Sequence, residues 1–391
     1  MPESRWDVVI LGAGPAGALT ATLAARNGAR TLLLERAAFP RHKVCGCCLA
    51  EQGQQILEQH GLASVMHNAQ RPDHTRIQIN TPGKSPATAS IRSTTHATIA
   101  RDAMDAALVQ HAIDAGAIFR DNAPARLDPA NAAVRVQNEI LRTRTVIIAD
   151  GLASASLRDD PRFRWRTQRL SRVGLGSIVE SETDAARALA REFDPHTITM
   201  TAARAGYVGV AALPNDRWAI AAAIDPEAIR TTPGAPREAL RTIFRQSNQN
   251  TDWLDSIDFK GVPTLTRHRN IIEADGRVFL VGDAAAYVEP FTGEGMSWAL
   301  LSASQLHHHM LAALAGRYRP GDWTRQSRRG SASRHLFCKA VAGILRRPTL
   351  ARALVRTLAA QPRLADRFAS LALAHTTKPR RTRTGAGWAA G

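Results

Sequence analysis

The sequence of 391 residues lacks any long uninterrupted apolar run, and only 5% of its residues are aromatic. A membrane-spanning helix needs roughly 18 apolar residues without charges or breakers, and the sequence holds no such stretch. The longest apolar stretch, residues 8–25, is interrupted by the glycines and the proline at positions 12, 14, 15 and 17. We therefore expect neither a membrane span nor a signal peptide, and we expect a cytoplasmic protein.

Cysteine is also scarce, with four residues at positions 45, 47, 48 and 338. Disulfide frameworks occur in short secreted chains with regularly spaced cysteines, so none is expected here. A zinc site would need further Cys or His ligands near the first three cysteines, and none follows them. Adjacent residues of a helix point about 100° apart, so His307, His308 and His309 do not easily share one ion. We expect no metal.

Acidic residues are nearly absent from the C-terminal segment, residues 317–391. This segment holds 17 basic and two acidic residues and so carries +15 of the net charge of +17. Leu350, Leu354 and Leu358 share one helical face there, and arginines project from another. The pattern is typical of a helix at an anionic membrane surface, but it also fits a helix that packs on the body of the protein. Nucleic acid is not an expected partner, because no aromatic platform accompanies the charge.

The body of the chain reads as a globular α/β protein. Its 44% hydrophobic content excludes general disorder, and the length suits two packed units with a small appendage. Buried strands are predicted at 7–11, 31–35, 145–149 and 277–281. Between the last two, residues 172–225 alternate in places like an antiparallel sheet, and the pattern from 298 onward is helical. The chain is thus expected to leave a parallel sheet, build a second sheet, and return.

A glycine-rich loop follows the first predicted strand and opens a helix. Gly12 permits the tight turn, Gly14 lets the backbone approach a pyrophosphate, and Gly17 lets helix and strand pack closely. The helix N-terminus attracts phosphate charge. Glu35 ends the next strand, about twenty residues on, and can accept hydrogen bonds from a ribose diol. The motif predicts dinucleotide binding but does not by itself separate NAD from FAD.

Two further strand ends and one helix start complete the pattern. A strand ends in Asp150-Gly151, another ends in Gly282-Asp283 ahead of a proline- and glycine-rich loop, and Arg101 begins a helix. With the glycine-rich loop these motifs cover roughly residues 5–315. In order and spacing they resemble the FAD-dependent monooxygenases of the para-hydroxybenzoate hydroxylase type, in the branch of the geranylgeranyl reductases and flavin halogenases.

The resemblance implies a Rossmann-like FAD-binding domain of the glutathione-reductase type, with an inserted antiparallel substrate sheet and C-terminal helices. It implies domain bounds of 1–165 and 270–315 for FAD, with an excursion near 75–95 into the sheet, and 166–269 for substrate. A helical segment at 316–375 and a disordered basic tail at 376–391 would follow.

The resemblance also implies roles for particular residues. Asp283 would bond the ribitol chain, Arg101 would reach the pyrophosphate side, and Asp150 would serve FAD and NAD(P)H. Arg158 stands one residue later than in the usual Asp-Gly-x-x-Ser-x-x-Arg pattern. Lys43 to Leu49 resembles the Lys-x-Cys-Gly segment beside the flavin ring in the reductases and halogenases. The expected cofactor-binding residues are Gly12, Gly14, Pro15, Ala16, Gly17, Glu35, Arg36, Lys43, Cys45, Arg101, Asp150, Gly282, Asp283, Pro290, Gly293, Gly295 and Met296.

The chemistry remains open among four readings. The resemblance favours a monooxygenase that hydroxylates an aromatic or polyketide-like lipophilic substrate, with NAD(P)H or a separate reductase as electron donor. Reduction of an isoprenoid or other unsaturated lipid is the alternative, followed by halogenation and by a non-catalytic redox sensor. Residues 206–214 lack the tryptophans of the halogenase segment, and Lys84 sits in a turn-like context. Tyr207 and Phe291 are expected to line the substrate side. No catalytic base is evident, and peripheral contact with the inner membrane face stays open.

Overall fold

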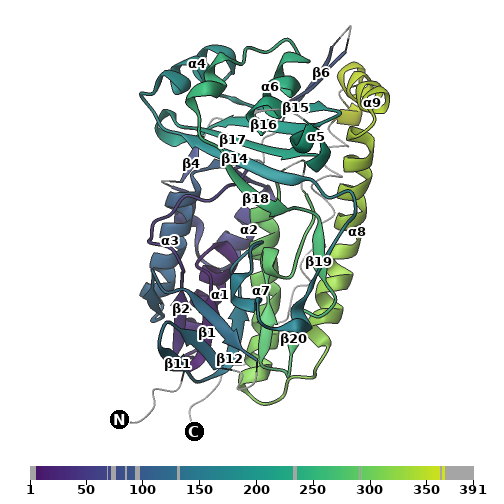
Figure 1. Cartoon of the computed structure of the whole chain (residues 1–391). Helices are drawn as coiled ribbons and strands as arrows, with labels where there is room; N and C mark the ends of the chain where they lie inside the picture. The colour runs from purple at the N-terminus through teal and green to yellow at the C-terminus, as the bar shows by residue number, and fades with distance from the viewer. Residues whose placement is uncertain are drawn as a thin grey trace.

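The computed structural model describes residues 6–67, 69–71, 76–83, 86–92, 97–129, 133–231, 236–289, 291, 293–361 and 363–365. Two large sheets lie one above the other, and helices run along one side of both (Figure 1). The predicted α/β fold with a second sheet and C-terminal helices is confirmed. The predicted tail at 376–391 lies outside the described residues, as do Lys84 and Pro290.

The first sheet has six strands in the order β20-β21-β12-β1-β2-β8, and all neighbours are parallel except β20 and β21. Almost every residue of β1 and β2 is buried, because α1, α7 and the small sheet β9–β11 pack around this six-stranded sheet. The strands are β1 (Trp6–Leu11), β2 (Thr31–Leu34), β8 (Ile118–Arg120), β9 (Ala125–Asp128), β10 (Ala133–Val136), β11 (Glu139–Leu141), β12 (Thr143–Ile148), β20 (Glu273–Ala274) and β21 (Val278–Leu280).

The second sheet has seven strands in the order β18-β14-β17-β16-β15-β5-β6. It is antiparallel except where β15 pairs with β5, so it is a mixed sheet rather than the wholly antiparallel one expected. The parallel pair arises because β5 and β6 reach this sheet from the first half of the chain. The strands are β5 (Arg76–Thr81), β6 (Ala87–Arg92), β14 (Val173–Val179), β15 (Thr197–Ala203), β16 (Gly206–Ala212), β17 (Trp218–Ile224) and β18 (Lys260–Thr264).

The two faces of the second sheet bury different cores. One face packs an aromatic cluster of Phe193, Trp218, Phe244 and Trp253 under α4 (Asp184–Glu192) and α6 (Arg237–Arg245). The other face turns its aliphatic residues toward the first domain and the C-terminal helices. Short strands connect the two sheets: β3 (Cys48–Leu49), β4 (Gln70–Arg71), β7 (Ala97–Ile99), β13 (Trp165–Thr167), β19 (Arg267–Arg269) and β22 (Ala286–Tyr287).

The remaining helices frame the junction of the sheets. They are α1 (Pro15–Arg26), α2 (Glu51–Gln59), α3 (Arg101–Asp114), α5 (Pro226–Thr231), α7 (Gly295–Leu314), α8 (Asp322–Leu345) and α9 (Pro348–Ala360). Helix α8 starts beside β20, where the Glu273 carboxylate accepts hydrogen bonds from Tyr318 and from the backbone of Gly321 and Thr324. Trp323 adds a bond of 2.9 Å from its indole nitrogen to the Leu280 carbonyl. Anchored there, α8 runs along the molecule to the far sheet (Figure 1).

The apolar stripe predicted on the last helix belongs mainly to the core. Val355 and Leu358 are buried, Leu354 is partly buried, and α9 packs on β5 and β6. The packing alternative is therefore confirmed for these residues. Leu350 differs, because 44% of it remains exposed.

Within the described residues, no helix is long and apolar enough to cross a membrane. The same residues contain no group of three or more His, Cys, Asp or Glu side chains placed to hold a metal ion. The consecutive histidines contact separate neighbours: His307 lies 3.0 Å from the Asn27 amide nitrogen and His309 lies 2.9 Å from the Gln326 amide oxygen.

Candidate cofactor and substrate site

The turn from β1 into α1 depends on glycine for its shape. A Cβ at Gly17 would lie 1.8 Å from the Gly12 carbonyl oxygen, and a Cβ at Gly12 would lie 2.5 Å from the Ala149 carbonyl oxygen. Gly14 is different, since within the described part of the chain the Arg41 Nη2 atom, at 3.7 Å, is the one atom near its Cβ position. The turn is thus closed toward the protein at Gly12 and Gly17 and open at Gly14, which is the arrangement that lets a ligand's phosphate approach the backbone.

Glu35 closes one side of this turn. Its carboxylate accepts bonds from the backbone nitrogens of Ala13 (3.1 Å) and Ala37 (3.2 Å), and it pairs with Arg41 at 3.0 Å. Burial by itself would raise the pKa of Glu35, but Arg41 and the Ala13 N–H outweigh it and lower the pKa below its usual range. Glu35 is therefore a fixed anion beside the loop, whereas the neighbouring Arg36 is exposed to solvent.

Two residues that the sequence analysis missed, Arg41 and Asp105, join the turn to α3. Arg41 also contacts the buried Asp105 carboxylate at 3.1 Å. The same carboxylate receives two bonds from Arg101, at 3.1 and 2.8 Å, which hold this buried guanidinium in a forked geometry. Asp105 lies one helical turn after Arg101, and this i,i+4 spacing of opposite charges was the available signal.

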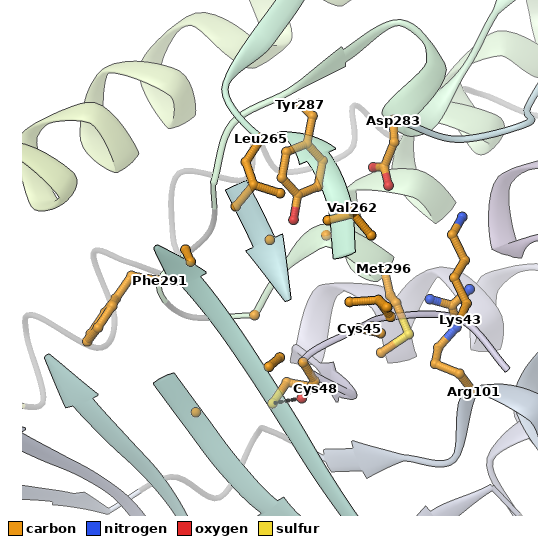
Figure 2. Close-up of a pocket in the computed structure, with 18 of the residues that line it drawn as sticks. Lys43, Cys45, Cys48, Arg101, Val262, Leu265, Asp283, Tyr287, Phe291 and Met296 are labelled. Atoms are coloured by element: carbon orange, nitrogen blue, oxygen red, sulfur yellow. Dashed lines mark hydrogen bonds between the residues drawn. The ribbon is translucent and has the colours of Figure 1, made fainter. Parts of the chain in front are cut away.

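Lys43 and Asp283 face each other across the centre of the site, with Arg101 beside Lys43 (Figure 2). Burial lowers the pKa of Lys43, and the Arg101 charge lowers it further, while Asp283 opposes both. Burial raises the pKa of Asp283, against the opposing effect of Lys43 and Arg101. The site thus gathers buried charges of both signs, and the desolvated ammonium of Lys43 favours an anionic ligand.

Cys45 sits in the same electropositive corner. A hydrogen bond from the Cys47 thiol lowers the pKa of Cys45 to about 5, burial works against this, and Arg101 assists it. Burial raises the pKa of Cys48 to about 12, and its thiol donates to the Gly46 carbonyl at 3.1 Å. Cys45 is therefore the acidic thiol of the cluster, and its neighbours stay protonated.

Asp150 follows β12 at the carboxyl end of the first sheet. One carboxylate oxygen accepts the backbone N–H of Ser156, in the short 3₁₀ helix Ala155–Leu157, at 3.0 Å. The other oxygen is buried, with no partner in the described part of the chain, and burial raises the pKa of Asp150. Arg158 is exposed. This second carboxylate oxygen, at the end of a strand, can accept a hydrogen bond from a ligand's hydroxyl group.

The loop that leads into α7 brings a helix N-terminus to the same space. Gly293 adopts a φ of +79°, and a Cβ there would lie 2.8 Å from the Cys48 Cβ. The loop therefore approaches the 45–48 segment closely, and α7 begins at Gly295 with Met296 buried behind it. Free backbone N–H groups at a helix start stabilise negative charge in front of them.

One cavity connects this site to the second sheet. Its cofactor end holds Gly14, Pro15, Ala16, Lys43, Cys45, Arg101, Asp283, Gly293, Gly295 and Met296. Its other end is aliphatic and small: Ile77, Ile79, Ile91, Gly174, Leu175, Ile198, Met200, Gly209, Val210, Ala211, Ala221, Ala222, Ala223, Val262 and Leu265. The sheet thus forms an apolar chamber that opens onto the charged end.

Aromatic residues also line the cavity. Tyr207 and Phe291 line it and pack edge to face, with ring centroids 5.1 Å apart, and Tyr287 lines it nearer to Asp283 (Figure 2). Behind Tyr207, Arg172 is fully buried and pairs with Glu289 at 2.8 Å. This ion pair joins residues 117 positions apart, and the sequence analysis did not foresee it.

These features fit FAD. The open backbone at Gly14 and the buried cations beside it suit a pyrophosphate. The carboxylate oxygen of Asp150 that has no partner in the described chain suits a sugar hydroxyl. The N-terminus of α7 suits a ring that carries negative charge when reduced. Ten of the 17 expected cofactor residues line this cavity. Arg36 is exposed, Pro290 lies outside the described residues, and the lining does not include Gly12, Gly17, Glu35, Asp150 or Gly282.

Comparisons with known proteins agree with this geometry. The model of the FAD binding domain family matches residues 5–329. A menaquinone reductase of Mycobacterium tuberculosis is 28% identical over 338 residues, covering 79% of this chain and 78% of that protein. A digeranylgeranylglycerophospholipid reductase 1 of Methanopyrus kandleri is 28% identical over 321 residues, covering 76% and 78%. The flavin-dependent brominase Bmp2 shares the fold, with a TM-score of 0.76 at 17% identity over 94% of this chain and 93% of that one.

Replacing Gly14 with valine is expected to give a folded protein that does not retain FAD. The protein itself leaves room for the added atoms, but the cofactor's pyrophosphate needs that space. Flavin absorbance after purification and a thermal melt are the measurements. Gly17→Val is the contrast: its Cβ would collide with Gly12, so it should lower the melting temperature sharply. FAD binding by Gly14→Val at wild-type affinity would show that the cofactor does not approach this turn.

Replacing Asp283 with alanine is expected to weaken FAD binding about ten- to a hundredfold while the protein stays folded. Loss of a hydrogen bond from a charged group costs roughly 1.5–3 kcal/mol. Fluorescence titration of the apoprotein with FAD gives the affinity. Asp184→Ala is the matched control, because that carboxylate is exposed at the start of α4. Equal affinity in the two variants would rule out a role for Asp283 in binding.

Proposed function

Since the chain belongs to the FAD binding domain family and is an FAD-dependent oxidoreductase, we propose that it reduces a carbon–carbon double bond of an isoprenoid lipid. The observation that carries the proposal is the aliphatic end of the cavity, which is continuous with the cofactor end. An isoprenoid chain has no charge to pair and gains free energy when it leaves water for such a chamber.

The shape of the chamber supports a slender, flexible substrate. Strands β14, β16 and β17 contribute glycine and alanine to the lining, and these small residues leave space in the chamber. Isoleucine and methionine from β5, β6 and β15 form another part of the lining. Tyr207 and Phe291 pack on each other and add an aromatic surface to this chamber. A branched hydrocarbon chain could thread this chamber with one double bond at the charged end and the rest among the isoleucines.

The residues of the cofactor end have complementary tasks. Reduced FAD supplies a hydride to a bound double bond. Glu35 would hold the ribose, Arg41 and Arg101 would face the pyrophosphate, and Asp283 would hold the ribitol chain. The start of α7 would stabilise negative charge on the ring. The aromatic pair and the aliphatic wall exclude water from the space where the double bond lies.

The named relatives support reduction over the other readings. A menaquinone reductase and a digeranylgeranylglycerophospholipid reductase are each 28% identical to this chain over most of its length. Likeness to a brominase is a likeness of fold at 17% identity. On β16 the positions that line the cavity are Tyr207, Gly209, Val210 and Ala211, with no tryptophan among them. We therefore prefer the reductase reading to hydroxylation of an aromatic substrate. In this proposal the electrons that reduce the flavin come from NAD(P)H or from a separate reductase.

An anaerobic single-turnover experiment tests the function. Holoenzyme with its flavin reduced is mixed with a geranylgeranyl lipid in the absence of oxygen, and flavin absorbance is followed. We expect the flavin to be reoxidised at a rate that saturates with lipid concentration. The lipid product should have gained two hydrogens. The fully saturated lipid of the same length is the matched control and should leave the flavin reduced. A flavin that stays reduced with every unsaturated lipid, and reoxidises only when oxygen is admitted, would contradict reduction.

We further propose that the protein collects its lipid at an anionic membrane surface. Leu350 is 44% exposed at the start of α9, Leu336 is 71% exposed on α8, and both lie in the basic segment 317–391. Basic residues beside exposed apolar ones favour contact with anionic lipid, at about 1 kcal/mol for each basic residue near the surface.

Replacing Arg347 and Leu350 together, by glutamate and aspartate, is expected to reduce sedimentation with anionic vesicles severalfold without loss of FAD. Wild-type binding should fall as salt is raised, because the attraction is electrostatic. Ile140→Asp is the control; it removes an apolar side chain of similar exposure, 55%, on β11 at the opposite end of the molecule (Figure 1). If the double variant sediments with vesicles like the wild type, α9 is not the contact.

A further inference from the structure

We propose that Tyr287 is the proton donor of this reaction: its hydroxyl delivers the proton that completes reduction of the double bond. The assignment rests on the reductase function proposed above. Adding hydride to one carbon of a double bond requires a proton at the other, and the group that gives it has to stand inside the cavity beside the cofactor end.

The position of Tyr287 meets this requirement. It lies on β22, between the Gly282-Asp283 turn and the loop that opens α7, so it follows one flavin motif and precedes the other. A Cβ at Gly295 would lie 3.9 Å from the Tyr287 Cε2 atom, which places the ring against the first residue of α7. Figure 2 shows its hydroxyl directed into the cavity, toward Val262 and the side where Met296 lies.

The Tyr287 hydroxyl also has its proton available. No hydrogen bond joins it to another residue of the described chain, although it lines the cavity. Two other polar groups near the cofactor end are already engaged: Arg101 is held by Asp105, and the Cys48 thiol donates to Gly46. A side chain that is aimed at the reacting space and has no protein partner is free to donate to substrate.

The surroundings keep the proton on the oxygen until it is needed. Burial raises the pKa of Tyr287 well above its usual value, and nearby acidic groups raise it further. These groups come from every side: Asp283 from the preceding turn, Cys45 from the loop opposite, Glu289 from the segment that follows, and Cys338 from α8. The hydroxyl therefore remains protonated across the neutral range, and its donation should not vary with pH there.

Tyr207 is the competing tyrosine, and its placement is less suitable. Its ring packs edge to face on Phe291 and lies 5.4 Å from the Arg172 guanidinium carbon. It comes from β16 in the second sheet, whereas Tyr287 follows directly from the Gly282-Asp283 turn. Tyr207 is thus placed to shape the chamber, and Tyr287 to reach the double bond.

The step balances in atoms and electrons. The π bond of the alkene breaks, one carbon receives hydride from the reduced flavin, and the other receives the proton from the Tyr287 Oη atom. Two C–H bonds form, and the flavin loses one hydride, which carries one proton and both electrons. The phenolate left on Tyr287 regains a proton from water once product leaves.

The test compares Tyr287→Phe with Tyr318→Phe in the full-length holoenzyme. Tyr318 is the matched control, since its hydroxyl bonds to Glu273 at the start of α8, away from the cavity. Tyr287→Phe should bind FAD and a geranylgeranyl lipid in the oxidised state as the wild type does, measured by fluorescence titration and flavin difference spectra. Its anaerobic flavin reoxidation by that lipid should be slower by about a hundredfold, the usual loss for a general acid.

A solvent isotope effect separates proton donation from a structural role. Wild type and Tyr318→Phe should reoxidise more slowly in D₂O, with deuterium found at one carbon of the product, and Tyr287→Phe should show a changed isotope effect. The assignment would be overturned if Tyr287→Phe reoxidised its flavin at the wild-type rate, or if Tyr207→Phe alone lost this rate. Either result would leave the reductase function intact. If the wild type itself reduces no unsaturated lipid, the proposed function falls and the assignment falls with it.

Discussion

The close contact between Gly12 and Gly17 is the constraint on which the rest of the site depends. With no side chain at either position, α1 starts directly against the end of β1 and close to Ala149 at the end of β12. Helix α1 then packs on both α3 and α7. The starts of those two helices carry Arg101 and Gly295, so one backbone contact brings the glycine turn, a buried cation and a helix N-terminus to one space.

Charge and apolar surface are separated along the cavity, and this separation gives the site its chemistry. At one end, Lys43, Arg41 and Arg101 are desolvated among the carboxylates of Glu35, Asp105 and Asp283, and the Lys43 ammonium would pair with an anionic cofactor. At the other end, the described residues of the second sheet that line the cavity are aliphatic or small, apart from Tyr207. A cofactor that carries charge and a lipid that carries none can therefore meet in the middle, where water is excluded.

The sequence alone predicted those parts of the site that lie within short, continuous motifs. The glycine turn, Glu35, Arg101 and the Gly282-Asp283 motif each follow a strand or open a helix, so short patterns reveal them. It did not reveal Arg41 with Asp105, or Arg172 with Glu289, because those pairs join distant segments only after folding. The parallel pairing of β5 with β15 is equally non-local. The leucine stripe of α9 was ambiguous for the same reason: only the packed sheet shows which leucines are covered.

The mass of the product formed in air tests the central claim most directly. Holoenzyme, an electron donor and a geranylgeranyl lipid are incubated with oxygen present, so that reduction and hydroxylation compete in one vessel. The account predicts a product that has gained two hydrogens at one double bond and no oxygen atom, because the cavity places a hydrocarbon chain at the flavin end and excludes water from it. A product that has gained one oxygen atom would contradict the account and assign the protein to the hydroxylases.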